Sequence, residues 1–198
     1  MPSGSSDAQA RDDIDEQYDR LRRMADGWLS ENVDPFVKVR AALMAPRSLL
    51  FVGQAELALR LLRHLAEDML PATPNYDHLY IVLANMAYCH NALGDQTGDE
   101  EHYREAIKLI QRIRRIQRAR EEAEKSDRAY DSWHAVDLAY AYMRLGDDDR
   151  MERALHEAAE FTPDFEDLIP WFTKLHPELE GALQAALAEA RPKRDDDL

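Results

Sequence analysis

The chain has 198 residues, of which 45% are hydrophobic, and a formal net charge of −14. This length allows one domain, or one domain with extensions. The negative charge disfavours general binding to nucleic acid or to an anionic membrane, because their phosphates would be repelled. The single cysteine, Cys89, excludes an intramolecular disulfide and fits a reducing compartment.

The two ends of the chain are polar, and neither predicts a folded element. Residues 1–10 lack the apolar run of a signal peptide, and residues 191–198 include three consecutive aspartates. We expect both ends to be disordered, with a single helical domain over 11–190. The longest apolar stretch, 79–89, is well short of the ~20 residues that a membrane-spanning helix needs. The sequence therefore predicts a cytoplasmic protein.

Between the ends, apolar residues recur at helical spacing and strand-like alternation is almost absent, which predicts an all-α fold. In chain order, the predicted helices cover residues 12–29, 35–51, 54–70, 75–93, 100–125, 149–161, 165–175 and 177–190. A further helix, capped by Ser126 or Asp127, is expected to end at Gly146. Pro46 interrupts the second helix, because proline removes a backbone donor and clashes with the preceding turn.

One phrase occurs twice in the sequence. Residues 85–95 and 137–147 both contain Met or Leu, then Ala-Tyr, four further residues and Leu-Gly-Asp. Each copy predicts a helix that ends at its glycine, Gly94 or Gly146, and is followed by a second amphipathic helix. Repeated helix pairs stack into solenoids, which usually bind other proteins.

These features resemble the tetratricopeptide repeat (TPR) family, whose unit of about 34 residues alternates two helices. The best match is 132–163, a weaker one is 80–113, and a third degenerate unit is 39–71. The best match rests on Leu138, Ala139, Tyr142, Gly146, Asp147, Ala158 and Pro163. The resemblance implies antiparallel helix-pair repeats, a TPR-like α-solenoid with flanking helices at both ends.

In this family the first helix of each unit lines a concave groove. By resemblance, the partner-binding residues here are Ile81, Tyr88, Asn91, Trp133, Tyr140 and Arg144. This aromatic and apolar surface suits an amphipathic helix or an extended peptide of another protein. The alternative is that the C-terminal helices of the chain itself cover Trp133 and Tyr140.

A basic run stands out in this acidic chain. Residues 104–120 hold seven basic residues against Glu105, a local net charge of +6. We call five of them, at helical spacing, the basic strip: Arg104, Lys108, Arg112, Arg115 and Arg118. The strip is predicted to dock an acidic partner by electrostatic attraction. The alternative is a solvated face, or pairing with carboxylates of the 12–29 helix and of residues 121–124.

Little in the sequence predicts catalysis. The seven histidines share no metal-ligand spacing, and the sequence has neither a Gly-rich phosphate loop nor a Gly-x-Ser-x-Gly elbow. The sequence therefore predicts a non-catalytic adaptor or scaffold without a cofactor. Its partner is another protein, not nucleic acid or a membrane. Two alternatives stay open: a structural subunit of a homo-oligomer such as a homodimer, and a metal-dependent helical-bundle enzyme.

Overall fold

The computed structural model describes residues 16, 18–20, 23, 46, 49–50, 52–69, 76–124, 132–162 and 164–195. Within these residues the regular structure is helical and no strand occurs, so the all-α prediction is confirmed for this part of the chain. The chain forms two compact units, the N-terminal unit (Met1–Leu93) and the C-terminal unit (Gly94–Leu198). The predicted disorder of 1–10, most of the helices over 12–29 and 35–51, the Ser126 or Asp127 cap and Pro163 lie outside the described residues.

In the N-terminal unit, the predicted 54–70 helix is α3 (Ala55–His64), which continues into the π-helical turn η1 (Leu65–Met69). Leucines 57, 59, 61 and 62 of α3 are buried. Gly53 precedes α3 with a positive φ of 78°. The N–H of Gln54 donates to the carbonyl of Leu49 at 2.9 Å, and the N–H of Gly53 to that of Leu50 at 3.1 Å. This hydrogen-bond pair is the Schellman pattern that ends a helix at a left-handed glycine.

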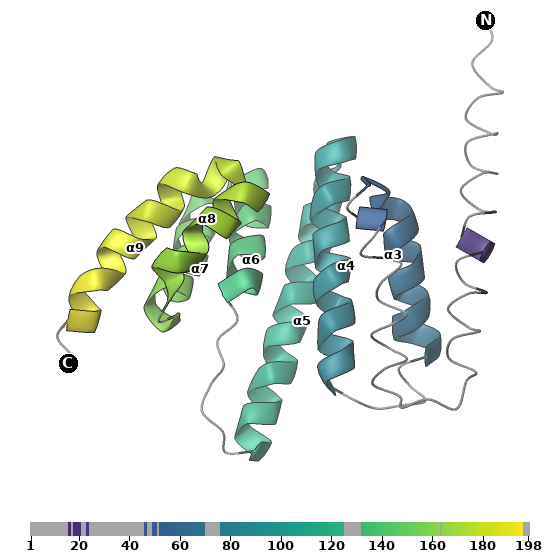
Figure 1. The fold of residues 1–198 in the computed structure, drawn as a ribbon, viewed down its shortest axis with the longest axis horizontal. Coiled ribbons are helices and arrows are strands. Elements are labelled where there is room, and N and C mark those ends of the chain that lie inside the picture. The colour runs from purple at the N-terminus through teal and green to yellow at the C-terminus, as the bar shows by residue number, and fades with distance from the viewer. Residues whose placement is uncertain are drawn as a thin grey trace, which may run out of the picture. The chain divides into compact units, whose positions relative to one another are not determined.

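The C-terminal unit is a set of packed helix pairs (Figure 1). Its elements are α5 (Glu100–Glu124), α6 (Ser132–Arg144), α7 (Asp148–Phe161), α8 (Phe165–Leu175), η3 (Pro177–Leu179) and α9 (Glu180–Asp195). Helix α6 packs against α5 and α7, while α9 packs against α7 and α8. The observed bounds of α5, α7 and α8 agree closely with the predicted ones. Helix α9 continues to Asp195, so the helix does not end where the acidic tail was predicted to begin.

The core of the C-terminal unit combines large and small side chains. Phe165, Phe172 and Leu155 are almost fully buried, and so are Ala106, Ala139 and Ala158. The alanines lie on α5, α6 and α7, the helices that pack against one another in sequence. Small side chains at these positions let the helix backbones approach closely, while the larger ones fill the spaces between them.

The two glycines of the repeated phrase have different roles. Gly146 ends α6 as predicted, with φ of 70° and a Schellman pair of hydrogen bonds. The same prediction for Gly94 was wrong, because α4 (Tyr76–Thr97) continues past it and Gly98, with φ of 71°, takes the left-handed position. A Cβ at Gly94 would lie 2.5 Å from Cζ of Tyr103. Gly94 is therefore needed for the close approach of a ring, not for a turn.

We expect Gly94→Ala to destabilise the protein by about 1–3 kcal/mol, the usual cost of overpacking a core. The Tyr103 ring cannot move aside easily, because it is 2% exposed. Gly181→Ala is the matched control, since a Cβ there meets nothing within 4 Å and alanine favours a helix by up to ~1 kcal/mol. Urea unfolding followed by circular dichroism measures both variants. Equal stability of Gly94→Ala and the wild type would contradict this role of Gly94.

Candidate functional site

Helix α5 presents one buried face and one charged face. Tyr103, Ala106, Ile110 and Ile113 are buried, all 2% exposed or less. All five residues of the basic strip are exposed. The 3.6-residue period of the helix produces this separation, because residues three or four positions apart share one side of the helix. The strip residues therefore lie on a different side from the buried ones. The basic strip is thus accessible along the length of α5.

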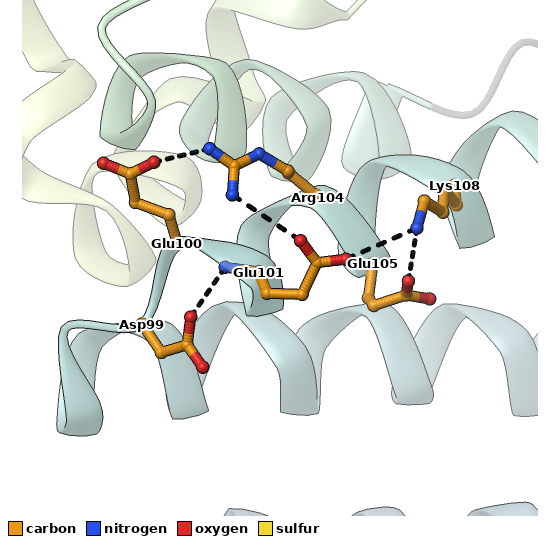
Figure 2. A network of polar contacts seen from close by, with 6 residues as sticks. All are labelled: Asp99, Glu100, Glu101, Arg104, Glu105 and Lys108. Atoms are coloured by element: carbon orange, nitrogen blue, oxygen red, sulfur yellow. Dashed lines mark hydrogen bonds and ion pairs between the residues drawn. The ribbon is translucent and has the colours of Figure 1, made fainter.

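The first turn of α5 is acidic and well capped. Oδ1 of Asp99 accepts a hydrogen bond from the backbone N–H of Glu101 at 3.0 Å (Figure 2). Oγ1 of Thr97 accepts one from the N–H of Asp99 at 3.2 Å. Glu100 and Glu101 also complement the positive end of the helix dipole. The residues that start the helix therefore also place carboxylates beside the first basic residues of the strip.

These carboxylates neutralise the N-terminal half of the strip. Arg104 pairs with Glu100 at 2.6 Å and with Glu101 at 3.5 Å. Lys108 pairs with Glu101 and Glu105, and the hydrogen bond to Glu105 is the main cause that raises the pKa of Lys108 (Figure 2). Most of these pairs have the i, i+3 or i, i+4 spacing that brings side chains together on a helix. Arg104 and Lys108 are therefore paired within α5 itself, through carboxylates other than those predicted from the sequence.

The C-terminal half of the strip differs. We call Arg112, Arg115 and Arg118 the distal strip. None of the three forms an ion pair with any side chain that the structure describes. Because they are three residues apart, they are neighbours on the helix surface. The distal strip is thus the part of the predicted docking surface whose charge no described carboxylate cancels.

The groove residues of α6 are engaged by the C-terminal segment of the same unit. The ring of Trp133 packs edge-on against Phe172 of α8 at 4.8 Å, and the ring of Tyr140 stacks on His176 at 4.1 Å. A His176 ring nitrogen lies 3.1 Å from Oδ1 of Asp137. Tyr140 is only 4% exposed, whereas Trp133 is 40% exposed. Residues around α8 therefore occupy much of this face of α6.

A single carboxylate bonds to side chains from two helices of the C-terminal unit, α5 and α6. Asp95, at the end of α4, accepts hydrogen bonds from the hydroxyl of Tyr103 at 2.7 Å and from that of Tyr140 at 2.8 Å. Nε of Arg144 donates to the Tyr103 hydroxyl at 3.0 Å and lies 3.4 Å from Asp95. Burial, and then the bond to Asp95, raises the pKa of both tyrosines. We call these four residues the Asp95 cluster, in which Tyr140 and Arg144 have structural partners.

The remaining predicted groove residues belong to the N-terminal unit. Ile81 and Tyr88 are half-buried on α4, and Asn91 is buried at 2% exposure. Cys89, on the same helix, is fully buried, and burial raises the pKa of its thiol to about 12. The thiol therefore stays protonated at neutral pH and is a poor nucleophile. Cys89 is therefore a buried small residue of α4.

One feature of the site could not be found from the sequence. A pocket in the C-terminal unit is lined by residues of α5, α6 and α7, among them Arg114, Arg150 and Arg153. The last two follow three aspartates in the sequence, so charge patterning marks this segment as acidic. Only the packing of α5 and α7 against α6 brings the α7 arginines toward the basic run.

Neither a metal-binding cluster nor a membrane-spanning helix occurs among the described residues. No group of three or more His, Cys, Asp or Glu side chains in that part of the chain is arranged to hold a metal ion. None of the helices described there combines the length and the apolar character needed to cross a bilayer. Comparisons with protein-family models, curated proteins and solved structures gave no match.

We expect Tyr103 and Tyr140 to resist ionisation at a pH just above ~10, where exposed tyrosines lose their proton. The folded state favours the neutral phenols. Their contribution to stability is therefore complete below ~10 and is lost as the pH rises through their higher folded pKa. Alkaline titration of tyrosinate absorbance should show a late phase that Tyr140→Phe reduces. In Asp95→Asn, the late pKa should fall only partly, because burial is the larger cause. A single phase for all tyrosines would contradict this expectation.

Proposed function

We propose that this protein is a non-catalytic adaptor or scaffold that binds an acidic segment of another protein through the distal strip of α5. The observation that carries the proposal is the contrast along one helix. Local carboxylates neutralise Arg104 and Lys108, whereas Arg112, Arg115 and Arg118 are exposed and pair with no described carboxylate. An arginine fork is suited to carboxylates, which it can bind through two parallel hydrogen bonds.

The distal strip can attract an acidic partner although the chain carries a net charge of −14. At physiological ionic strength the screening length is about 8 Å, so charges farther away act weakly. Three arginines over six residues of helix span about 9 Å, at 1.5 Å per residue. A docked segment therefore experiences mainly the charges of this part of α5, not those of the whole chain. A partner helix with carboxylates at i, i+3 or i, i+4 spacing would match them.

The TPR resemblance supports the same class of function. The repeated phrase lies on two helices, α4 and α6, and the second copy forms a helix pair with α7 around the Gly146 turn. Stacked helix pairs without a catalytic constellation generally act as binding surfaces. In this proposal the α6 surface around Trp133, the most exposed aromatic residue of that helix, is a second contact surface.

The distal strip predicts a specific loss of affinity. We expect the triple variant Arg112→Gln, Arg115→Gln, Arg118→Gln to bind a fluorescent Glu-rich helical peptide about tenfold more weakly, from three exposed pairs at roughly 0.5 kcal/mol each. Most of the loss should be in the association rate, because exposed charges steer encounter. Stopped-flow fluorescence at low and high salt measures it, and the wild-type rate should fall as salt rises.

The matched control replaces three other exposed arginines by glutamine: Arg20, Arg23 and Arg63. This variant has the same net charge as the distal-strip variant, so it separates a local site from a general charge effect. We expect its affinity to remain close to that of the wild type. Equal weakening in both variants would contradict the proposed site.

A second candidate function is a structural subunit of a homo-oligomer. Trp171 is 59% exposed and Leu175 is 44% exposed. They are four residues apart, so they form an apolar stripe on α8. Exposed apolar surface of this kind is typical of protein interfaces.

If α8 mediates self-association, light scattering should give the mass of a dimer at high concentration. Trp171→Glu should return the protein to a monomer, because a charge in an apolar interface loses its hydration. Phe161→Glu, at a 51% exposed position of α7, is the control and should leave the dimer intact. A wild-type protein that stays monomeric at every concentration would exclude this candidate.

A further inference from the structure

The pocket of the C-terminal unit has a volume of about 270 Å³ and lies among α5, α6 and α7. Its lining consists of Arg114, Leu138, Tyr142, Arg150, Arg153, Ala154 and Glu157. Pockets for drug-sized ligands usually measure about 300–1,000 Å³. This pocket is therefore suited to one side-chain head group or a small ion, not to a larger cofactor.

The lining contains three arginines and one carboxylate, Glu157. Nη1 of Arg114 lies 3.2 Å from Oε2 of Glu157, and these side chains are 22% and 36% exposed. Arg150 lies over the ring of Tyr142 at 5.6 Å, and its Nε is 3.3 Å from Asp147 outside the lining. These contacts orient two of the three guanidinium groups beside the pocket.

Arg153 is the pocket arginine whose terminal N–H donors remain available for a ligand. Its Nε donates to the backbone carbonyl of Asp149 at 3.0 Å, which directs the side chain along α7. No carboxylate among the described residues pairs with it. A guanidinium has five N–H donors. The terminal nitrogens of Arg153 can therefore bind an oxyanion while its Nε keeps the hydrogen bond to the carbonyl of Asp149.

The pocket borders the distal strip through Arg114. Arg114 lies one turn before Arg118, so these two side chains are neighbours on the surface of α5. A segment docked along the distal strip would therefore pass the pocket. The side chains of Leu138 and Ala154 in the lining offer apolar contact for the methylene groups of an entering side chain.

We propose that the pocket is a subsite for an oxyanionic side chain, a carboxylate or a phosphate monoester, on the segment that docks on the distal strip. This proposal rests on the proposed function for its partner and deepens it by assigning the chemistry of one anchor residue. Arg114 and Arg153 hold the oxygens, and Arg150, oriented over Tyr142, adds positive charge. Arginine clusters of this kind recognise phosphate and carboxylate groups through paired hydrogen bonds.

The test uses the full-length protein and three fluorescent peptides. They share glutamates that reach the distal strip and differ at one anchor residue, which is glutamate, phosphoserine or glutamine. We expect Arg153→Gln to weaken binding of the glutamate and phosphoserine peptides about tenfold, since hydrogen bonds to charged groups are the stronger ones. The glutamine peptide should bind the variant and the wild type equally. Arg63→Gln, an exposed arginine of α3, is the control and should change nothing.

The preferred anchor identifies the oxyanion. Tighter binding of the phosphoserine peptide, lost in Arg153→Gln, assigns the pocket to a phosphate group, and a preference for glutamate assigns it to a carboxylate. Equal affinity of all three peptides for the wild type would overturn the subsite. Circular dichroism of Arg153→Gln should match the wild type, because the replaced side chain is exposed.

A second measurement separates this proposal from the function on which it rests. Titration with inorganic phosphate should shift the NMR signals of the Nε–H groups of Arg114, Arg150 and Arg153 in the wild type but not in Arg153→Gln. Peptide binding that depends on the distal strip but not on Arg153, without phosphate shifts, would overturn the pocket and leave the docking function intact. The opposite result would be NMR shifts on phosphate titration together with a peptide affinity that the distal-strip substitutions leave unchanged. It would support the pocket and overturn the docking function.

Discussion

The Asp95 carboxylate is the interaction on which the rest of the C-terminal unit depends. It accepts hydrogen bonds from Tyr103 of α5 and Tyr140 of α6, whose rings are almost completely buried. A buried hydroxyl without a partner costs about 1–3 kcal/mol, so one carboxylate satisfies two such groups. Gly94 comes just before it and allows the Tyr103 ring to lie against the helix backbone. Gly94 and Asp95 therefore act together in fixing α5 and α6.

This constraint determines which surfaces remain for binding. The hydroxyl of Tyr140 donates a hydrogen bond to Asp95, and its ring stacks on His176. The α6 face that a TPR-like groove would use is therefore largely occupied by the unit itself, with Trp133 as its exposed part. The exposed face of α5 is not used in this way. Carboxylates in the first two turns of α5 cancel Arg104 and Lys108, so among the described side chains of this face the distal strip keeps its unneutralised charge.

The repeated phrase shows how similar residues can do different work. In the second copy Gly146 makes the left-handed turn, and Asp147 caps α7 by accepting a hydrogen bond from the N–H of Arg150. In the first copy the helix continues past the glycine. The Tyr103 ring packs against Gly94, and Asp95 accepts hydrogen bonds from the hydroxyls of Tyr103 and Tyr140. Gly98, four residues after Gly94, adopts the left-handed conformation that Gly146 adopts in the second copy. The likeness of the two copies therefore lies in sequence more than in contacts.

The sequence by itself determined most of the helices of the described residues, the turn at Gly146 and the exposed side of α5. These features depend on apolar periodicity, local capping and the allowed φ of glycine, which act within a few residues. Only the tertiary structure decided the role of Gly94, the Asp95 cluster and the arginine-lined pocket. Asp95 and Tyr140 are 45 residues apart, and Arg153 reaches the basic run only through helix packing. No local pattern records such contacts, because they depend on which helix faces meet.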